Sequence, residues 1–250
     1  MTNPVWVWAI EHRLTGYSLN KAFHGPPSKD VGPCWSFSRY GRTETVLPDG
    51  RLVRIGGEYE DHYDADFYIY NDVIVSHPGS GTEILGYSDE VFPPTDFHTA
   101  NLVDDRIFIV GNLSYPNVRG HKAQVLVLDI TNFGVGRFDT TGETPPWIYK
   151  HSSELVEDGG ALLVRGGRLI GPRWPGVVEN IDDWRLDLHT GAGSALPGGS
   201  GRDLHSFEMM AVKIISFGFA AAFQIAPVAD QRTATAFEPN IFAISAPILE

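Results

Sequence analysis

Apolar residues along this chain recur in short runs bounded by Asp and Gly. Three runs share one form: "DGRLVRIGG", "DDRIFIVGN" and "DGGALLVRGG", whose glycines Gly56, Gly111 and Gly166 are 55 residues apart each time. Each run has the length of a strand, begins after a turn pair and ends at a small residue that permits a sharp exit. The pattern predicts that each run is the second strand of a β-hairpin.

The sequence around these runs predicts three more strands in each repeat. First strands are expected in "FSRYGRTETVL", "FPPTDFHTANLV" and "PPWIYKHSSELV", with Arg42, His98 and His151 at their starts. A fourth copy, "GRDLHSFEMMAV", places His205 54 residues after His151. Third strands are expected at 71–75, 124–130 and 182–188, each followed by a turn and a weaker fourth strand.

Four features recur in the same order: four strands, a period near 50, a small-residue pair after the second strand, and Asn-Asp or Asp-Asp before the third. In these features the chain resembles the kelch-type β-propellers. The resemblance implies an all-β, kelch-like propeller of about four blades in one domain, residues 1–250. The repeats would span 35–90, 91–144, 145–198 and 199–250, with 1–34 as an orphan half blade.

The two ends of the chain depart from the repeat. "VWVWAI" with a turn at Thr15-Gly16 is expected to supply orphan strands that close a ring, because closure removes exposed strand edges. A short ring, an incomplete ring completed by a second copy of the chain, and a truncated sequence all fit the pattern. Residues 214–219 are expected to be a buried strand, because they stand where the fourth hairpin is due after His205. The uninterrupted apolar run from Ile214 to Phe223 suits buried core better than a membrane span of ~20 residues.

Composition narrows the classes of partner. The formal net charge of -12, with no compensating run of Lys or Arg, argues against nucleic acid and against anionic membrane surfaces. One cysteine, Cys34, excludes an internal disulfide framework, and the first residues lack a signal-peptide core. The chain is therefore expected to be cytoplasmic, with a protein or a small ligand as its partner.

The stretch "GEYEDHYDAD" follows the first glycine pair and is expected to be a rim loop, where binding function concentrates. It fits a calcium site poorly, because it lacks the alternating ligands and the turn glycine of a calcium loop. A catalytic carboxyl pair would need burial. A solvated acidic rim and a partner-binding surface are the favoured interpretations. The candidate binding residues, to which an exposed Trp174 is added, are Glu58, Tyr59, Glu60, Asp61, His62, Tyr63, Asp64 and Asp66.

Arg42, His98, His151 and His205 are expected at the mouth of a central channel. Imidazoles on a symmetry axis can hold a transition metal, but a repeated residue is more often part of the scaffold, and Arg42 cannot be a ligand. The sequence thus predicts a non-catalytic binding propeller with no cofactor, no metal and no catalytic residue. The alternative is a propeller enzyme that uses these histidines and rim carboxylates.

Overall fold

The computed structural model describes residues 4–25, 35–60, 67–171 and 176–197. The described chain is mostly β, as predicted, and forms several small, largely antiparallel sheets. It lies within the first of two compact units, residues 1–201; the second unit is 202–250. Cys34, His205, the expected strand at 214–219 and the whole of the expected fourth repeat fall outside the described residues.

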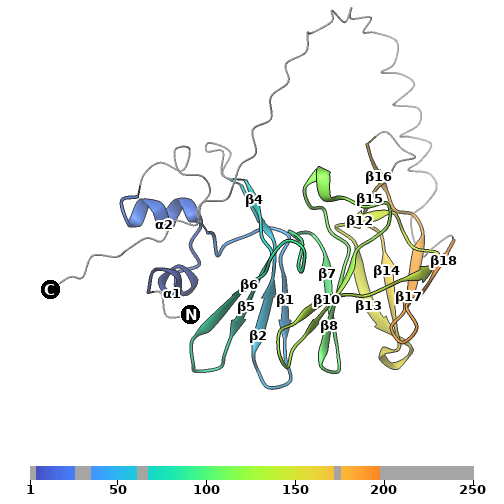
Figure 1. Cartoon of the computed structure of the whole chain (residues 1–250), viewed down its shortest axis with the longest axis horizontal. Coiled ribbons are helices and arrows are strands. Elements are labelled where there is room, and N and C mark those ends of the chain that lie inside the picture. The colour runs from blue at the N-terminus through green and yellow to red at the C-terminus, as the bar shows by residue number, and fades with distance from the viewer. Residues whose placement is uncertain (1–3, 26–34, 61–66, 172–175, 198–250) are drawn as a thin grey trace, which may run out of the picture. The chain divides into compact units, whose positions relative to one another are not determined.

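Three four-stranded antiparallel sheets follow one another along the chain (Figure 1). Sheet I contains β1 (Thr43–Val46), β2 (Leu52–Ile55), β5 (Asp72–Ser76) and β6 (Thr82–Gly86). Sheet II contains β7 (Thr99–Val103), β8 (Arg106–Val110), β9 (Val125–Asp129) and β10 (Val135–Arg137). Sheet III contains β13 (Ser152–Val156), β14 (Ala161–Arg165), β17 (Asp183–Asp187) and β18 (Ala192–Leu196). In each sheet neighbours along the chain pair in order, which confirms the predicted strands.

Smaller elements occupy the segments between these strands. β3 (Glu58–Tyr59) pairs with β4 (Tyr68–Ile69), and β12 (Trp147–Tyr149), β15 (Arg168–Ile170) and β16 (Val177–Glu179) form a three-stranded sheet. β11 (Thr141–Gly142) pairs in parallel with β18 at the edge of sheet III. Two 3-10 turns, η1 (Pro116–Val118) and η2 (Glu157–Gly159), complete the connections.

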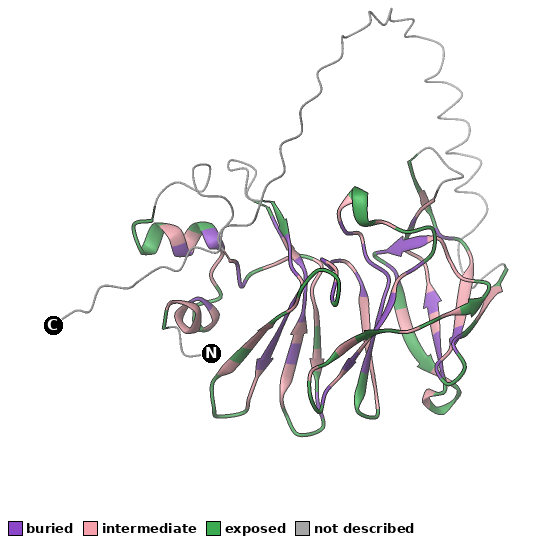
Figure 2. Cartoon of the chain, viewed as in Figure 1, coloured by how far each residue is buried: buried purple, intermediate pink, exposed green. Residues whose placement is uncertain are grey.

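The apolar cores lie between successive sheets. β7 contacts both β1 and β13, so the three first strands are neighbours. One core contains Ile55 and Val73 of sheet I together with Ile109 of sheet II. The next core contains Val110 of sheet II and Val164 of sheet III. Figure 2 shows the buried residues mainly on the strands and the exposed ones at the turns and on outer strands such as β13. The second strand of sheet II therefore alternates between the preceding and the following neighbour.

The far face of sheet III breaks this pattern. Counted from the glycines, Ile55 and Val110 are equivalent to Arg165, and the third-strand residues paired with them, Val73 and Val125, are equivalent to Asp183. Arg165 pairs with Glu154 and with Asp183. Arg185 on the same face pairs with Glu157 and Asp187. A ladder of ion pairs thus replaces the apolar residues that pack between the other sheets.

The near face of sheet I also carries an arginine where the other sheets are apolar. Arg54 is equivalent to Ile109 and Val164, and its guanidinium bonds the Glu44 carboxylate at 3.0 Å. It also lies over the ring of Phe37, 5.3 Å from the centroid, and Phe37 is buried. Phe37 belongs to the segment that joins the N-terminal helices to sheet I, so this segment covers the first sheet.

The expectation of strands in "VWVWAI" is wrong, because these residues lie in helix α1 (Pro4–Glu11). Pro4 suits a first helical turn, since it has no N–H to leave unpaired there. Trp6 and Trp8 each contact a different aromatic ring. Trp6 stacks on Trp35 and Trp8 meets Phe23 edge to face, each with ring centroids 5.5 Å apart. The expected turn at Thr15 is also wrong, because Thr15 caps helix α2 (Gly16–Ala22).

The second glycine of each pair packs closely against the residues that lead into a first strand. Gly57 has φ +94°, and a Cβ on it would lie 2.7 Å from the Cβ of Arg42. Gly167 has φ +83°, and a Cβ on it would lie 2.7 Å from the Cβ of His151. In sheet II the equivalent residue is Asn112, whose side chain donates to the Pro94 carbonyl and accepts from the Asp96 N–H. The departure from Gly-Gly there is therefore compensated by side-chain hydrogen bonds.

Candidate functional site

The β3–β4 hairpin carries the described part of the predicted acidic loop. Glu58 and Tyr59 form β3, and Glu60 follows it and is exposed. Tyr59 is buried, which argues against its predicted contact with a partner, because its ring is part of the core. The remaining candidates lie outside the described residues: Asp61, His62, Tyr63, Asp64, Asp66 and Trp174.

Strand alternation sorts the side chains of this hairpin. Glu58 pairs with Tyr40 on one side and with Ile69 on the other, and directly paired residues share a face of a sheet. Phe67 comes directly before β4, and its ring meets that of Tyr115 edge to face. Tyr40 is 66% exposed and Phe67 is 41% exposed. Tyr40, an accessible aromatic residue, therefore shares the face that carries Glu58, and a second accessible ring, Phe67, adjoins the hairpin at the start of β4.

The segments before β7 and after β8, which belong to the second repeat, contact this hairpin. The hydroxyl of Tyr115 accepts from the Ile69 N–H at 2.8 Å, and its ring meets Phe67 edge to face at 5.8 Å. Asp96 is fully buried, and its Oδ1 accepts from the Ser114 N–H at 2.7 Å. Its Oδ2 has no hydrogen-bond partner of ordinary geometry among the described residues. The carboxyl of Glu58 lies next to Asp96, close enough for the two groups to share a proton.

The two carboxyl groups are electrostatically coupled. Burial raises the pKa of Glu58 to about 7, with the neighbouring Asp96 and Glu60 acting in the same direction and Lys150 in the opposite one. Burial also raises the pKa of Asp96, against the lowering effect of the Ser114 N–H, Glu58 and Arg119. A pair of carboxyls in this setting holds one proton near neutral pH.

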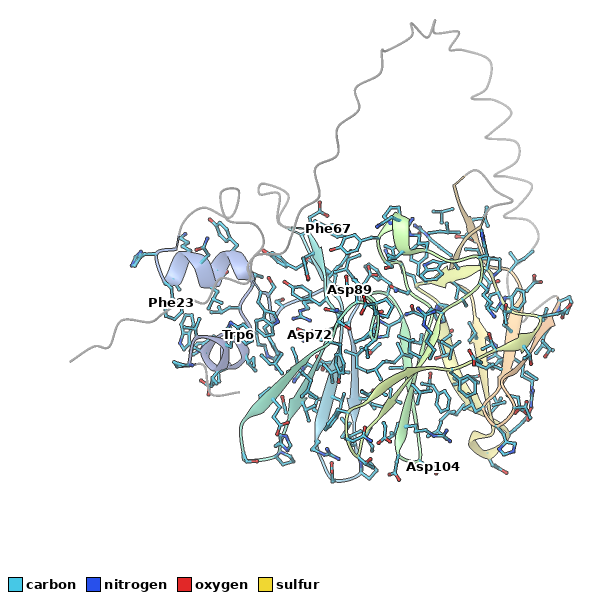
Figure 3. The ribbon with its side chains drawn as sticks, in the orientation of Figure 1. Trp6, Phe23, Phe67, Asp72, Asp89 and Asp104 are labelled. Atoms are coloured by element: carbon cyan, nitrogen blue, oxygen red, sulfur yellow. The ribbon has the colours of Figure 1, made fainter. Side chains whose placement is uncertain are left out.

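We call the group formed by these residues the rim cluster: Tyr40, Glu58, Glu60, Phe67, Asp96 and Tyr115. Figure 3 shows Phe67 and Asp89 at the end of the sheets where β4 lies, and Asp104 at the opposite end, in the turn between β7 and β8. Asp89 is exposed and accepts from Asn71 Nδ2 at 2.9 Å. Carboxylates and aromatic rings thus gather at one end of the described sheets.

The predicted channel-mouth residues occupy equivalent places but act within the scaffold. His98 Nε2 lies 2.8 Å from Thr43 Oγ1, and His151 Nε2 lies 3.0 Å from Thr99 Oγ1, so each ring joins one first strand to the preceding one. Burial lowers the pKa of His98 to about 3 and that of His151 to about 4, so both rings are neutral. Arg42 donates to the Phe37 carbonyl and to Glu44.

Within the described residues no group of three or more His, Cys, Asp or Glu side chains could hold a metal ion. A catalytic role for His98 and His151 gains no support from their burial and their bonds to threonine hydroxyls. Trp147 is buried and donates to the Leu113 carbonyl at 3.2 Å, so it packs within the fold.

A groove of about 400 Å³ lies on sheet II beside Asp89. Its lining includes Pro94, Lys122, Arg137 and Trp147. The lining mixes cations with carboxylates, and it includes none of the residues predicted from the sequence as a site. The rim cluster is therefore the better candidate, because it joins predicted residues to an unsatisfied buried carboxyl.

Comparisons with known proteins give little more. No family model matches the sequence, and no curated protein does so either. A solved structure titled "Structure of YjhT" is similar, with a TM-score of 0.46 and 15% identity over 66% of this chain and 53% of that chain. The chain thus spans about half the length of that protein. Among the described helices, none has the length and apolar character needed to cross a membrane.

Sequence reasoning missed most of the rim cluster. It singled out Glu58 and Glu60 but not the other four members. One signal was available for Asp96: counted two positions back from His98, it is equivalent to Tyr40 before Arg42 and Tyr149 before His151, so an acid stands where the other repeats carry an aromatic ring. The contact between Phe67 and Tyr115 could not be found from the strand pattern, because the two residues lie in connecting segments of different repeats.

Proposed function

We propose that this chain is a kelch-like propeller-type binding protein, and that its rim cluster contacts a basic protein partner. The propeller interpretation is supported by three copies of the four-stranded sheet whose first strands lie side by side. The formal charge of -12 favours a basic partner through electrostatic attraction at encounter.

One observation carries the assignment of the surface. Tyr40 and Phe67 are large and exposed; Tyr40 is the cross-strand neighbour of the partly buried Glu58, and Phe67 adjoins the β3–β4 hairpin. Exposed aromatic residues supply contact area at protein interfaces, and aromatic residues are enriched among those that dominate binding energy. Charged residues at the edge act mainly on the rate of encounter. The cluster has both kinds of residue, whereas His98 and His151 are enclosed in the scaffold.

A capture experiment tests this function. Immobilised parent protein and the double variant Tyr40→Ser/Phe67→Ser would be exposed to a cell lysate at low and at high salt. We expect the parent to retain basic proteins at low salt, and the double variant to lose those proteins while it melts at nearly the same temperature. Tyr17→Ser is the matched control, because Tyr17 is 45% exposed but lies in helix α2 and is not part of the rim cluster.

The proposal is rejected if the double variant retains the same proteins as the parent. It is also rejected if the Tyr17→Ser control loses them to the same extent, because the contact would then depend on general surface hydrophobicity. Replacing Glu60, Asp61 and Asp64 by Gln or Asn should in addition weaken capture at low salt, since these charges act on encounter.

A further inference from the structure

The rim cluster contains a feature that a general contact surface does not need. A buried carboxylate oxygen without a hydrogen-bond partner is costly, and Asp96 Oδ2 is such an atom among the described residues. The group beside it, Glu58, is another carboxyl and not a donor such as Arg or Lys. These two neighbours can satisfy each other only by sharing a proton.

The charged side chains that face Glu58 and Asp96 do not neutralise the two carboxyl groups. Glu60 lies on the same strand face as Glu58, Lys150 comes from the segment before β13, and Arg119 comes from the segment after β8. The Lys150 ammonium already lies over the ring of Phe97, 4.3 Å from its centroid. Arg119 donates to the carbonyls of Leu113 and Ser114. Neither cation makes an ion pair within 4.0 Å with Glu58 or Asp96 among the described side chains.

The accessible side of the pair is flanked by aromatic rings. Tyr40 is the cross-strand neighbour of Glu58, and Phe67, directly before β4, meets Tyr115, whose hydroxyl bonds the Ile69 N–H of the same hairpin. Cations are attracted to the faces of aromatic rings, and the attraction grows when the cation is partly removed from water. Rings beside a carboxyl therefore fit an ammonium or guanidinium group better than an anion or an apolar side chain.

We propose that the rim cluster binds a lysine or arginine side chain of the partner, and that this cation displaces the proton shared by Glu58 and Asp96. The inference rests on the proposed binding function and names the chemistry of its contact. The exchange is balanced: one cationic side chain enters, and one proton leaves for the solvent. No bond other than the O–H bond of the carboxyl is broken.

The exchange makes the affinity depend on pH. With the pKa of Glu58 at about 7, the ionised form is about a tenth of the molecules at about pH 6 and about nine tenths at about pH 8. A ligand that binds only the ionised form has its apparent affinity reduced by that fraction. We therefore expect binding to be about tenfold tighter at about pH 8 than at about pH 6. Lysine and arginine stay charged throughout this range.

The test uses the full chain and a capped peptide of alternating lysine and glycine. The control peptide has norleucine in place of lysine. Titration calorimetry at constant ionic strength gives the affinity at each pH. Repeating it in two buffers of different ionisation enthalpy gives the number of protons released. We expect the lysine peptide to release protons on binding at about pH 6 and to bind about tenfold more tightly at about pH 8. The norleucine peptide should not bind.

Three variants locate the effect. Glu58→Gln should remove the dependence on pH and weaken binding at about pH 8 by about tenfold or more. Tyr40→Ser should weaken binding at every pH while the gain between the two pH values persists, because the carboxyl pair is intact. Asp104→Asn changes the net charge by the same amount as Glu58→Gln but lies at the opposite end of the sheets (Figure 3), and should bind like the parent.

The inference is overturned if the parent binds the lysine peptide without proton release, or if Asp104→Asn loses as much affinity as Glu58→Gln. Should Glu58→Gln fail to fold, the proton release of the parent and the behaviour of Tyr40→Ser still decide between the two outcomes. These failures differ from failure of the binding function itself. A chain that captures basic proteins through Tyr40 and Phe67 but releases no proton keeps the function and loses the exchange.

Discussion

At the scale of single residues, the three repeats differ at one position before each first strand. It directly precedes a residue whose backbone is in the left-handed region. Gly41, Phe97 and Lys150 all have positive φ, and the residues before them are Tyr40, Asp96 and Tyr149. The tyrosines pair with Glu58 and Arg168 respectively. Asp96 is buried in the place of an aromatic ring, and this difference creates the carboxyl pair. A single acidic residue in the place of a tyrosine thus gives this repeat a carboxyl pair that the other two repeats lack.

The pair should also affect stability. A carboxyl with a raised pKa in the folded state holds a proton that the unfolded chain has lost, so its contribution to stability falls as pH rises from about 4.5 to about 7. Glu58→Gln removes this loss. We expect the variant to exceed the parent at about pH 8 by about 1 kcal/mol after allowance for solvent screening, or a few degrees in Tm, and to match it below about pH 4.5.

Thermal unfolding across this pH range measures the effect. Glu90→Gln is the control, because Glu90 is exposed and is not part of the rim cluster. If the Tm of Glu58→Gln followed that of the parent at every pH, the two carboxyls would not share a proton.

At the scale of elements, the sequence was sufficient for the strands of the three sheets. Their apolar runs are bounded by turn residues at a constant period, and both signals are local. It failed for helix α1, because the alternation of apolar residues and tryptophans in "VWVW" imitates a strand, while the ring contacts that favour the helix come from Phe23 and Trp35. The rim cluster was found only in part, because its walls come from separate repeats.

The glycine exits are elements whose role can be tested. Gly57→Val should destabilise the fold by at least about 2 kcal/mol, because the left-handed backbone is strained for a β-branched residue and the new Cβ would meet the Cβ of Arg42. The same holds for Gly167→Val. Gly86→Val in β6 is the matched control, since a Cβ added there would have open space within 4 Å and the φ of Gly86 is not in the left-handed region. Denaturant titrations would compare the three variants, and equal midpoints would show the exits to be ordinary.

At the scale of the whole molecule, the two outer faces of the described sheets differ from the faces between them. The inner faces meet through branched apolar side chains, whereas Arg54 at one end and Arg165 at the other each stand where the other two repeats carry an apolar residue. Repeat proteins end in units with a polar outer face, which keeps the terminal surface soluble. On this arrangement we expect sheets I to III to form a stable unit by themselves.

A shortened chain ending at Gly201 tests that unit. Both apolar cores are built from residues between Leu47 and Leu188, and the far face of sheet III is covered by its own ion pairs. We therefore expect the shortened chain to unfold cooperatively within a few degrees of the full chain, because exposing an ion-paired surface costs little. A second shortened chain with Arg165→Val and Arg185→Val restores an apolar face like that of sheets I and II. It should self-associate, because exposed apolar patches drive association, and sedimentation velocity would detect this. If the first shortened chain aggregates while the full chain does not, the ion-pair ladder is not an end surface, and residues 202–250 contribute to the stability of the sheets.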